Sequence, residues 1–367
     1  MVCTLPPPVH GSAMVSQYIK DSKLINDEFD MYFVNLSTSR KMEEIGKVSP
    51  ILLIKKLGRF VSAYIKCFWL LLTNKYNLCY CAITCHGIGF LKDVPFVMLC
   101  KLFRRKIVIH QHNKGMSRSV DKWPYCWLLP LVYRNTKVML LSWYLYDDIS
   151  KVVGREQVLI CPNGIPEIPE ATNVFERNNP IPRLLFLSNL IESKGVYVLL
   201  DACKILKEKG YQFVCDFVGG ETKQITKEIF EEKVRKRGVE HIISYKGRKY
   251  GEAKQAEFRN SDIFAFPTFY DNETFGLVNL EAMQYKLPIV TTNEGGIPDV
   301  VEHMANGLIS ISRDADDLAK NIAILLNDER LRKVMGEKGY QMYKEKYTLE
   351  VFENTFKQCI DSCLGGG

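Results

Sequence analysis

The sequence predicts an α/β fold made of two doubly wound domains in tandem, and three observations lead to this prediction. Short β-branched runs alternate with longer amphipathic stretches, a pattern typical of parallel sheets built from βαβ units. The chain has 367 residues, which is more than a single hydrophobic core usually organises. Its hydrophobic fraction of 47% is ordinary for a globular protein and too high for a disordered one.

Residues 1–165 form the first predicted domain. Its strands are expected at Met31–Leu36, Leu78–Thr84, Lys106–His112, Lys137–Leu141 and Gln157–Cys161. A further strand at the start is confined to Met1–Leu5, because prolines follow it directly. A parallel central strand normally has about five or six residues, so this beginning is consistent with a natural chain that starts earlier.

The second predicted domain covers residues 183–345 and follows a linker at 166–182 that contains four prolines. Its strands are expected at Arg183–Leu187, Phe213–Val218, Ile242–Lys246, Ile263–Pro267, Pro288–Thr291 and Leu308–Ile311. Helices are expected at Tyr197–Lys209 and Lys223–Lys236, and a helical pattern runs from Asp314 to Leu364 with interruptions near Gly336 and Gly339. The last part, residues 346–367, is expected to be a helix that crosses back to the first domain.

The charge of the chain is distributed unevenly. Residues 1–170 hold 22 Lys and Arg against 13 Asp and Glu, a net +9, so the remaining residues carry −2 of the overall +7. A basic half favours an anionic partner there, such as a membrane surface, a diphosphate or a nucleic acid, although a solvated basic surface would have the same composition.

One stretch of the basic half, residues 51–72, has two interpretations that the sequence leaves open. It combines apolar residues such as Ile51, Phe68 and Trp69 with lysines and an arginine. A basic amphipathic helix of this kind can lie in a lipid interface. It can equally be a helix that faces the core and turns its basic side to solvent. A second basic cluster at 101–106 slightly favours the interpretation as a helix in a lipid interface.

The cysteines and the N-terminus indicate a cytoplasmic protein. The N-terminal residues lack a signal-peptide pattern, and cysteines in a cytosolic chain stay reduced. The cluster Cys79, Cys81, Cys85 and His86 lacks paired C-x-x-C spacing, so it is interpreted as buried strand residues rather than a metal site. The uncharged stretch Tyr76–Leu91 has only 16 residues, which is too short to span a bilayer as a helix.

The most informative segment runs from Pro267 to Gly296. A strand ends at Pro267, a polar loop carries Glu273, and Gly276 precedes a helical run that contains Glu281. Glycine lets the backbone approach a ligand, and N–H groups at a helix start favour anionic oxygens. Carboxylates accept hydrogen bonds from sugar and ribose hydroxyls. The combination therefore suits a nucleotide-sugar.

These residues resemble the retaining glycosyltransferases of GT-B family 4, also called glycosyl transferases group 1. Glu273 and Glu281 have the E-x7-E spacing of that family, with Phe275-Gly276-Leu277 between them. The turn at 187–195 and the segment at 162–165 also match. The resemblance implies a GT-B fold, in which two Rossmann-like domains face each other across a cleft.

The resemblance also implies roles for single residues. Glu281 would bind the ribose, Glu273 the hydroxyls of the donor sugar, and Lys194 the diphosphate. The backbone of Phe275, Gly276 and Leu277 would face the sugar and phosphate, and Gly247 and Arg248 would frame the base. In the first domain, Gly11 lies in a matching glycine loop, and His112, with His110 as the adjacent candidate, matches the histidine beside the reacting carbon. Glu273, His112 and Lys194 would form the catalytic set.

One departure from the family pattern concerns the donor site. The family usually has arginine where this chain has Asn189, so one cationic contact to the diphosphate is missing. Arg248 and Lys249 are the candidates to replace it, and the alternative is a donor that sits differently.

The expected activity is a metal-independent, retaining transfer of a sugar, without a cofactor, from a UDP- or GDP-linked donor. No D-x-D motif lies at a plausible strand end. The expected acceptor is a saccharide, favoured as a lipid-linked one in bacterial surface-polysaccharide synthesis, on the inner face of the plasma membrane. Two alternatives remain: a nucleotide-sugar-binding protein without turnover, and a sugar-phosphate synthase with a soluble acceptor. The absence of G-x-G-x-x-G opposes an NAD-dependent oxidoreductase, and little favours nucleic-acid binding.

Overall fold

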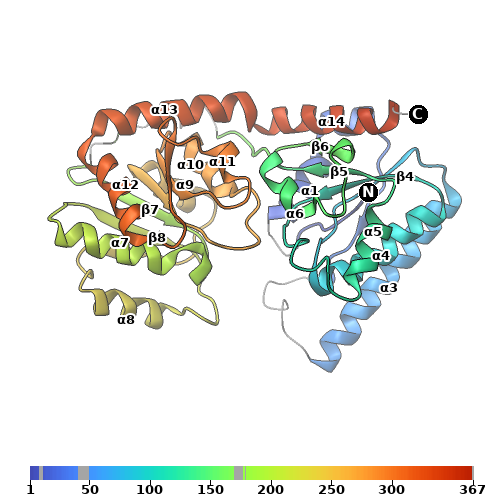
Figure 1. Cartoon of the computed structure of the whole chain (residues 1–367), viewed down its shortest axis with the longest axis horizontal. Coiled ribbons are helices and arrows are strands. Elements are labelled where there is room, and N and C mark those ends of the chain that lie inside the picture. The colour runs from blue at the N-terminus through green and yellow to red at the C-terminus, as the bar shows by residue number, and fades with distance from the viewer. Residues whose placement is uncertain (8–10, 40–48, 169–176, 178, 366–367) are drawn as a thin grey trace. The chain divides into compact units, whose positions relative to one another are not determined.

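The computed structural model describes residues 1–7, 11–39, 49–168, 177 and 179–365. It divides the chain into two compact units, whose elements are labelled in Figure 1. The first unit consists of Met1–Gly164 together with Leu349–Gly367, and the second is Ile165–Thr348. Each unit is an α/β fold around one parallel sheet, as the sequence predicts.

The sheet of the first unit has, in its described residues, six parallel strands in the order β2-β1-β3-β4-β5-β6. The strands are β1 Val2–Cys3, β2 Val34–Asn35, β3 Leu78–Cys81, β4 Lys106–Gln111, β5 Lys137–Leu140 and β6 Val158–Ile160. The expected strands are therefore confirmed, each somewhat shorter than expected. The short β1 is an internal strand and not an edge strand, because it pairs with β2 on one side and β3 on the other. The order reverses between β1 and β3, which creates a switch point at their carboxyl ends.

Helices cover both faces of this sheet. They are α1 Gly11–Asp21, α2 Lys23–Glu28, α3 Pro50–Thr73, α4 Gly87–Leu102, α5 Tyr125–Tyr133, α6 Tyr146–Ile149 and, from the end of the chain, α14 Leu349–Gly365. The apolar side of α14 is part of the core, since Phe352, Phe356 and Ile360 pack in one cluster with Val15 and Tyr80. The C-terminal helix thus completes the first unit.

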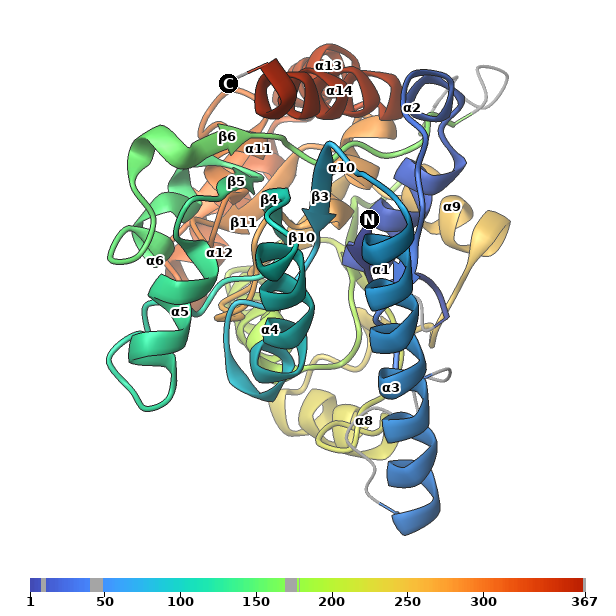
Figure 2. The same cartoon turned by 90° about the vertical axis from the view of Figure 1, so that its right-hand side faces the viewer.

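Helix α3 packs against α4, and Figure 2 shows the two running side by side. Only Cys67 and Leu71 of α3 are buried. Nine of its large apolar side chains are exposed: Ile51, Leu53, Ile54, Leu57, Val61, Ile65, Phe68, Trp69 and Leu72. The interpretation of residues 51–72 as a helix that faces the core therefore fails for most of its length. None of the described helices, α3 included, has the length and apolar character that crossing a bilayer requires.

The second unit repeats the architecture, with six described parallel strands in the order β12-β11-β10-β7-β8-β9. The strands are β7 Arg183–Leu187, β8 Val214–Val218, β9 Ile243–Tyr245, β10 Ile263–Phe266, β11 Ile289–Thr292 and β12 Gly307–Ser310. All lie where the sequence predicts them, within two residues at each end. The switch point lies between β7 and β10, which are neighbours although they are far apart in sequence.

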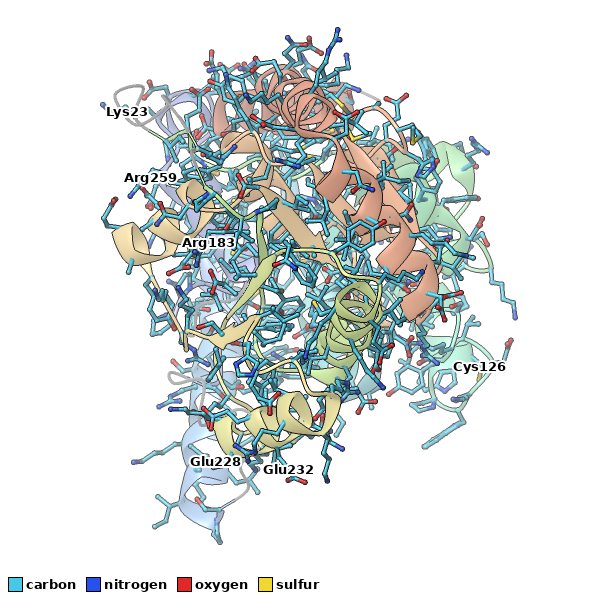
Figure 3. The ribbon with its side chains drawn as sticks, turned by 90° about the vertical axis from the view of Figure 1, so that its left-hand side faces the viewer. Lys23, Cys126, Arg183, Glu228, Glu232 and Arg259 are labelled. Atoms are coloured by element: carbon cyan, nitrogen blue, oxygen red, sulfur yellow. The ribbon has the colours of Figure 1, made fainter. Side chains whose placement is uncertain are left out.

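The helices of the second unit are α7 Val196–Glu208, α8 Lys227–Arg237, α9 Gly251–Arg259, α10 Leu277–Gln284, α11 Ile297–Val300, α12 Ala315–Asn327 and α13 Glu329–Lys346. Helix α8 begins four residues later than expected, because Thr226 caps it by accepting a hydrogen bond from the Ile229 amide. Its outer side is charged, and Glu228 and Glu232 point away from the sheet (Figure 3). Phe230 and Val234 form the buried side of this helix.

The expected interruptions near Gly336 and Gly339 are wrong. Both glycines lie inside α13, and the helical pattern instead breaks at Asp328 and at Tyr347–Thr348. A Cβ atom on Gly336 would lie 2.0 Å from the carbonyl oxygen of Lys286, at the end of α10. The glycine is there because α13 approaches the neighbouring backbone closely, not because the helix ends.

Candidate functional site

The loop after β7 carries Lys194 and is fixed to the end of β10. Gly195 has φ +91°, and a Cβ atom there would lie 2.2 Å from the carbonyl oxygen of Pro267. The amide of Phe269 donates a hydrogen bond of 2.7 Å to the carbonyl oxygen of Ser193. The two loops that meet at the switch point of the sheet are therefore held together by backbone contacts, and only glycine fits at the closest one.

This contact brings Lys194 to Glu273. The Lys194 Nζ atom lies 2.5 Å from Glu273 Oε2, with the two side chains 16% and 11% exposed. It also lies 4.4 Å from the ring centroid of Tyr270, within the range of a cation–π interaction. Two of the three predicted catalytic residues thus form a nearly buried ion pair at the carboxyl edge of the sheet.

The glycine before α10 has a left-handed backbone conformation. Gly276 is the N-cap of α10 with φ +65°, and it has no side chain to cap the helix. Phe275 is buried and packs against Tyr347, with ring centroids 5.8 Å apart, so only its backbone can face a ligand. Leu277 is the first residue of α10. The helix start is therefore available to an anion.

Glu281 lies further along α10 and is paired with a residue that the sequence analysis missed. Lys254 Nζ, from α9, lies 2.6 Å from Glu281 Oε2. The two side chains are about one-third exposed or less, at 31% and 25%. Each glutamate of the E-x7-E pair therefore has a lysine partner. Of these two lysines, the sequence pointed only to Lys194.

The remaining predicted donor residues of the second unit follow β7 and β9. The side-chain oxygen of Asn189 accepts a hydrogen bond of 3.2 Å from the Gly220 amide and lies 3.5 Å from Arg248 Nη2. Gly247 has φ +67°, and its carbonyl oxygen accepts a hydrogen bond of 2.9 Å from the Gly219 amide. The structure thus gathers the predicted donor residues of the second unit at one edge of its sheet.

In the first unit, the two candidate histidines have ring centroids 4.0 Å apart but different surroundings. His112 follows β4 and lines a cavity of about 130 Å³ with Ser12 and Ser16 of α1 and with residues that follow β1 and β3. His110 is fully buried, and its Nδ1 atom lies 2.8 Å from the Tyr80 hydroxyl. Burial, with His112 nearby, holds the pKa of His110 well below its usual value. The cavity at the switch point is therefore reached by His112 and not by His110.

Gly11 is the first residue of α1 and is exposed, next to the Ser12 that lines the cavity. The preceding part of the predicted glycine loop, residues 8–10, lies outside the described residues. A carboxylate that the sequence analysis missed, Asp148, fixes the loop after His112. It accepts hydrogen bonds from the amides of Gly115, Met116 and Ser117 at 2.8, 3.0 and 3.2 Å. Nothing in the sequence pattern indicated this role.

Comparison with known families gives a match within the second unit. The model of the family described as glycosyl transferases group 1 matches residues 167–342. The matched residues include the Lys194–Glu273 pair and the E-x7-E glutamates described above.

Curated relatives carry glycosyltransferase names. The chain is 32% identical over 236 residues to an amylovoran biosynthesis glycosyltransferase of Erwinia amylovora, covering 62% of this chain and 56% of that protein. It is 28% identical over 186 residues to a capsular polysaccharide biosynthesis glycosyltransferase of Staphylococcus aureus, covering 47% and 45%. The chain spans about half the length of the curated relatives it matches.

Solved structures share the fold at low sequence identity. The lipopolysaccharide outer core galactosyltransferase WaaB has a TM-score of 0.72 at 14% identity, covering 98% of both chains. HepE of Anabaena, solved in complex with UDP, has a TM-score of 0.68 at 17% identity, covering 83% and 82%. The fold is therefore of the GT-B type, with two Rossmann-like units.

Proposed function

We propose that this protein is a retaining glycosyltransferase that moves a sugar from a nucleotide-sugar to an acceptor hydroxyl. The observation that carries the proposal is the pairing of Lys194 with Glu273 at the switch point of the second sheet, within the group 1 match and beside the glycine-capped start of α10. Charged groups at this edge match the diphosphate and the hydroxyls of such a donor. HepE, which shares the fold, was solved with UDP, which supports a nucleoside diphosphate as the leaving group.

The proposed chemistry needs a group that stabilises the departing diphosphate. The bond between the sugar C1 atom and the phosphate oxygen breaks, and a bond from C1 to the acceptor oxygen forms on the same face. The leaving phosphate oxygen takes the acceptor proton. Lys194 and the N–H groups at the start of α10 stabilise the charge that develops, so we propose that the transfer proceeds without a metal ion.

Each residue then has a defined task. Glu273 accepts hydrogen bonds from hydroxyls of the donor sugar, and Glu281 accepts them from the ribose. In the first unit, His112 faces the cavity at the switch point, where the acceptor side of the reaction is expected. When the donor binds, its diphosphate competes with Glu273 for Lys194, which frees the carboxylate for the sugar.

For the acceptor, we propose a lipid-linked saccharide at an anionic membrane surface. Helix α3 supports this, because its exposed apolar side chains are interspersed with Lys55, Lys56, Arg59 and Lys66, and it contains no acidic residue. An apolar stripe with basic neighbours is what an interfacial helix presents to anionic lipid. The proposed location is thus the inner face of the plasma membrane, with the protein peripheral on it.

The activity test follows release of UDP or GDP from a panel of nucleotide-sugars, with and without a membrane extract as acceptor source. The proposal expects acceptor-dependent release from one donor, strongly reduced in Lys194→Met and Glu273→Gln. Donor binding without release would favour the nucleotide-sugar-binding alternative, and release with a soluble phosphosugar would favour the synthase.

The membrane component has its own test, co-sedimentation with vesicles of phosphatidylcholine and phosphatidylglycerol at low salt. Binding should fall when salt is added and in the double variant Lys55→Glu/Lys66→Glu. The control is Lys204→Glu/Lys320→Glu, which places the same charges on the second unit. Equal binding by both double variants would contradict the role of α3, and a dimer formed through α3 would appear in size-exclusion chromatography instead.

A further inference from the structure

The lysines at the carboxyl edge of the second sheet are already paired with carboxylates. Lys194 pairs with Glu273 and Lys254 with Glu281. In the loop between β9 and α9, Lys246 and Lys249 are also paired. Arg248, between these two lysines, is exposed and forms no ion pair with any carboxylate among the described residues. It is therefore the cation of this loop that is available to an anionic ligand.

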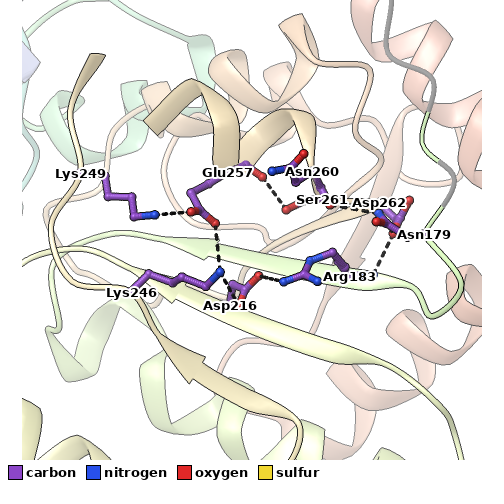
Figure 4. Close-up of polar contacts among 9 residues, drawn as sticks. All are labelled: Asn179, Arg183, Asp216, Lys246, Lys249, Glu257, Asn260, Ser261 and Asp262. Carbon is purple, nitrogen blue, oxygen red and sulfur yellow. Dashed lines mark hydrogen bonds and ion pairs between the residues drawn. The ribbon is translucent and has the colours of Figure 1, made fainter. Parts of the chain in front are cut away.

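Carboxylates anchor the loop on both sides of Arg248, through Lys246 and Lys249, and Figure 4 shows the contacts of these two lysines. Lys246 Nζ lies 3.5 Å from Asp216 Oδ1 and 3.9 Å from Glu257 Oε2. Lys249 pairs with the same Glu257. Asp216 is only 3% exposed and is itself fixed by Arg183, at 2.8 Å. Two anchored neighbours restrict the backbone of Arg248, so its side chain leaves the loop in a defined direction.

That direction is toward the ends of β7 and β8. Arg248 Nη2 lies 3.5 Å from Asn189 Oδ1, and a Cβ atom on Gly220 would lie 2.1 Å from the same Nη2 atom. Gly219 packs so closely on the β7 end that its Cβ would lie 1.7 Å from the Ser188 carbonyl oxygen. The guanidinium group thus lies over the glycine backbone at the end of β8, next to the neutral side chain of Asn189.

The geometry points to Arg248 as a residue that binds the diphosphate of the nucleotide-sugar donor. This inference rests on the proposed function and decides between the two parts that the sequence analysis gave Arg248, beside the base or at the diphosphate. It also separates the two candidates that the sequence offered to offset the neutral Asn189, because Lys249 is occupied by Glu257. A guanidinium group donates two parallel hydrogen bonds to phosphate oxygens, which suits this task better than a lysine.

The test is isothermal titration calorimetry of the full chain with UDP and with uridine, or with GDP and guanosine if GDP is the nucleotide that binds. Arg248→Ala should weaken nucleoside diphosphate binding by about 10- to 100-fold, the range of a charged hydrogen-bonding contact. Binding of the nucleoside should be unchanged, since it has no phosphate. Arg248→Lys should recover only part of the loss.

The matched control is Arg330→Ala, which removes an exposed arginine from α13 and should leave both affinities unchanged. A rescue variant adds a second test. Asn189→Arg in the Arg248→Ala background should restore part of the diphosphate affinity, because residue 189 lies beside the original guanidinium.

Three outcomes would overturn the inference. Arg248→Ala could bind the nucleoside diphosphate as tightly as the wild type. It could lose nucleoside affinity equally, which would assign Arg248 to the base. If the wild type bound no nucleoside diphosphate, the proposed function would fail and this inference with it, so the wild-type titration distinguishes the two failures.

Discussion

Replacing Lys194 by methionine probes the ion pair at the centre of the candidate site. The substitution keeps the length of the side chain and removes its charge, which leaves the Glu273 carboxylate without its partner 2.5 Å away. Breaking a fully buried ion pair costs about 3–5 kcal/mol, whereas an exposed pair contributes about 1 kcal/mol or less. With the side chains 16% and 11% exposed, we expect Lys194→Met to lower the free energy of unfolding by about 2–4 kcal/mol.

The pair can be isolated with a double-mutant cycle. Glu273→Gln should cost less, because Lys194 keeps its contact with the Tyr270 ring and with an amide oxygen. The combination of both substitutions should be more stable than the sum of the single losses predicts, by about 1–3 kcal/mol. The exposed pair Lys204–Glu208, at 3.7 Å, provides the control, and Lys204→Met should change stability by about 0.5 kcal/mol or less.

The assay is urea denaturation followed by far-UV circular dichroism, which reports both units. The four tryptophans, Trp69, Trp123, Trp127 and Trp143, all lie in the first unit, so their fluorescence reports that unit separately. The loss in Lys194→Met should appear in the transition of the second unit. The nearly buried ion pair would be refuted if the stability losses of Lys194→Met and Glu273→Gln simply added up in the double variant. It would also be refuted if Lys194→Met lost no more stability than Lys204→Met.

Three further predictions concern other parts of the molecule. Gly336→Ala should destabilise the second unit by about 1–3 kcal/mol, because its Cβ would meet the Lys286 carbonyl oxygen. Gly58→Ala in α3 is the control, which has open space around the new Cβ and should leave stability unchanged or raise it. Urea titrations in which both substitutions lowered the free energy of unfolding would contradict this. The pKa of His110 is lowered in the folded state, so the unfolded chain binds the extra proton as the pH falls below about 6.5, and stability should drop by up to about 1.4 kcal/mol per pH unit there. In denaturation curves between pH 7 and pH 5, His110→Asn should remove this dependence of stability on pH. The control for the loss of one histidine is His241→Asn, at an exposed position. An unchanged pH dependence in His110→Asn would contradict a buried, neutral His110 ring. In the activity assay, Lys254→Met leaves Glu281 unpaired, so it should raise the KM for the nucleotide-sugar several-fold while kcat changes little. If only kcat fell, the proposed contact of Glu281 with the ribose would be contradicted.

The strands could be predicted from the sequence because buried parallel strands are continuous apolar runs. Arg183–Leu187 was predicted with the bounds that the structure has. The breaks in the C-terminal helices were predicted at the wrong residues, because Gly336 is a packing glycine whose partner, Lys286, is distant in sequence. Capping residues such as Asp328 carried the relevant signal, since its side chain accepts a hydrogen bond from the Leu331 amide.

The candidate site was predictable where residues lie close in sequence and unpredictable where the fold brings them together. The loop with Glu273 and Gly276 forms one continuous segment, so its pattern is visible. Lys254 and Asp148 act through contacts with residues 27 to 33 positions away, and no local pattern indicates them. Asp216 is an intermediate case, because a carboxylate inside an apolar strand already indicates that charged partners must lie nearby.

The central claim is that the second unit holds a nucleotide-sugar donor, and a thermal-shift panel with UDP, GDP, CDP, ADP and NAD tests it most directly. At about 100 times its dissociation constant, a ligand adds roughly 2.7 kcal/mol, which should raise the melting temperature by several degrees. The account predicts a clear shift with one nucleoside diphosphate and its loss in Glu281→Ala. No shift with any nucleoside diphosphate, or an equal shift in Glu281→Ala, would contradict it.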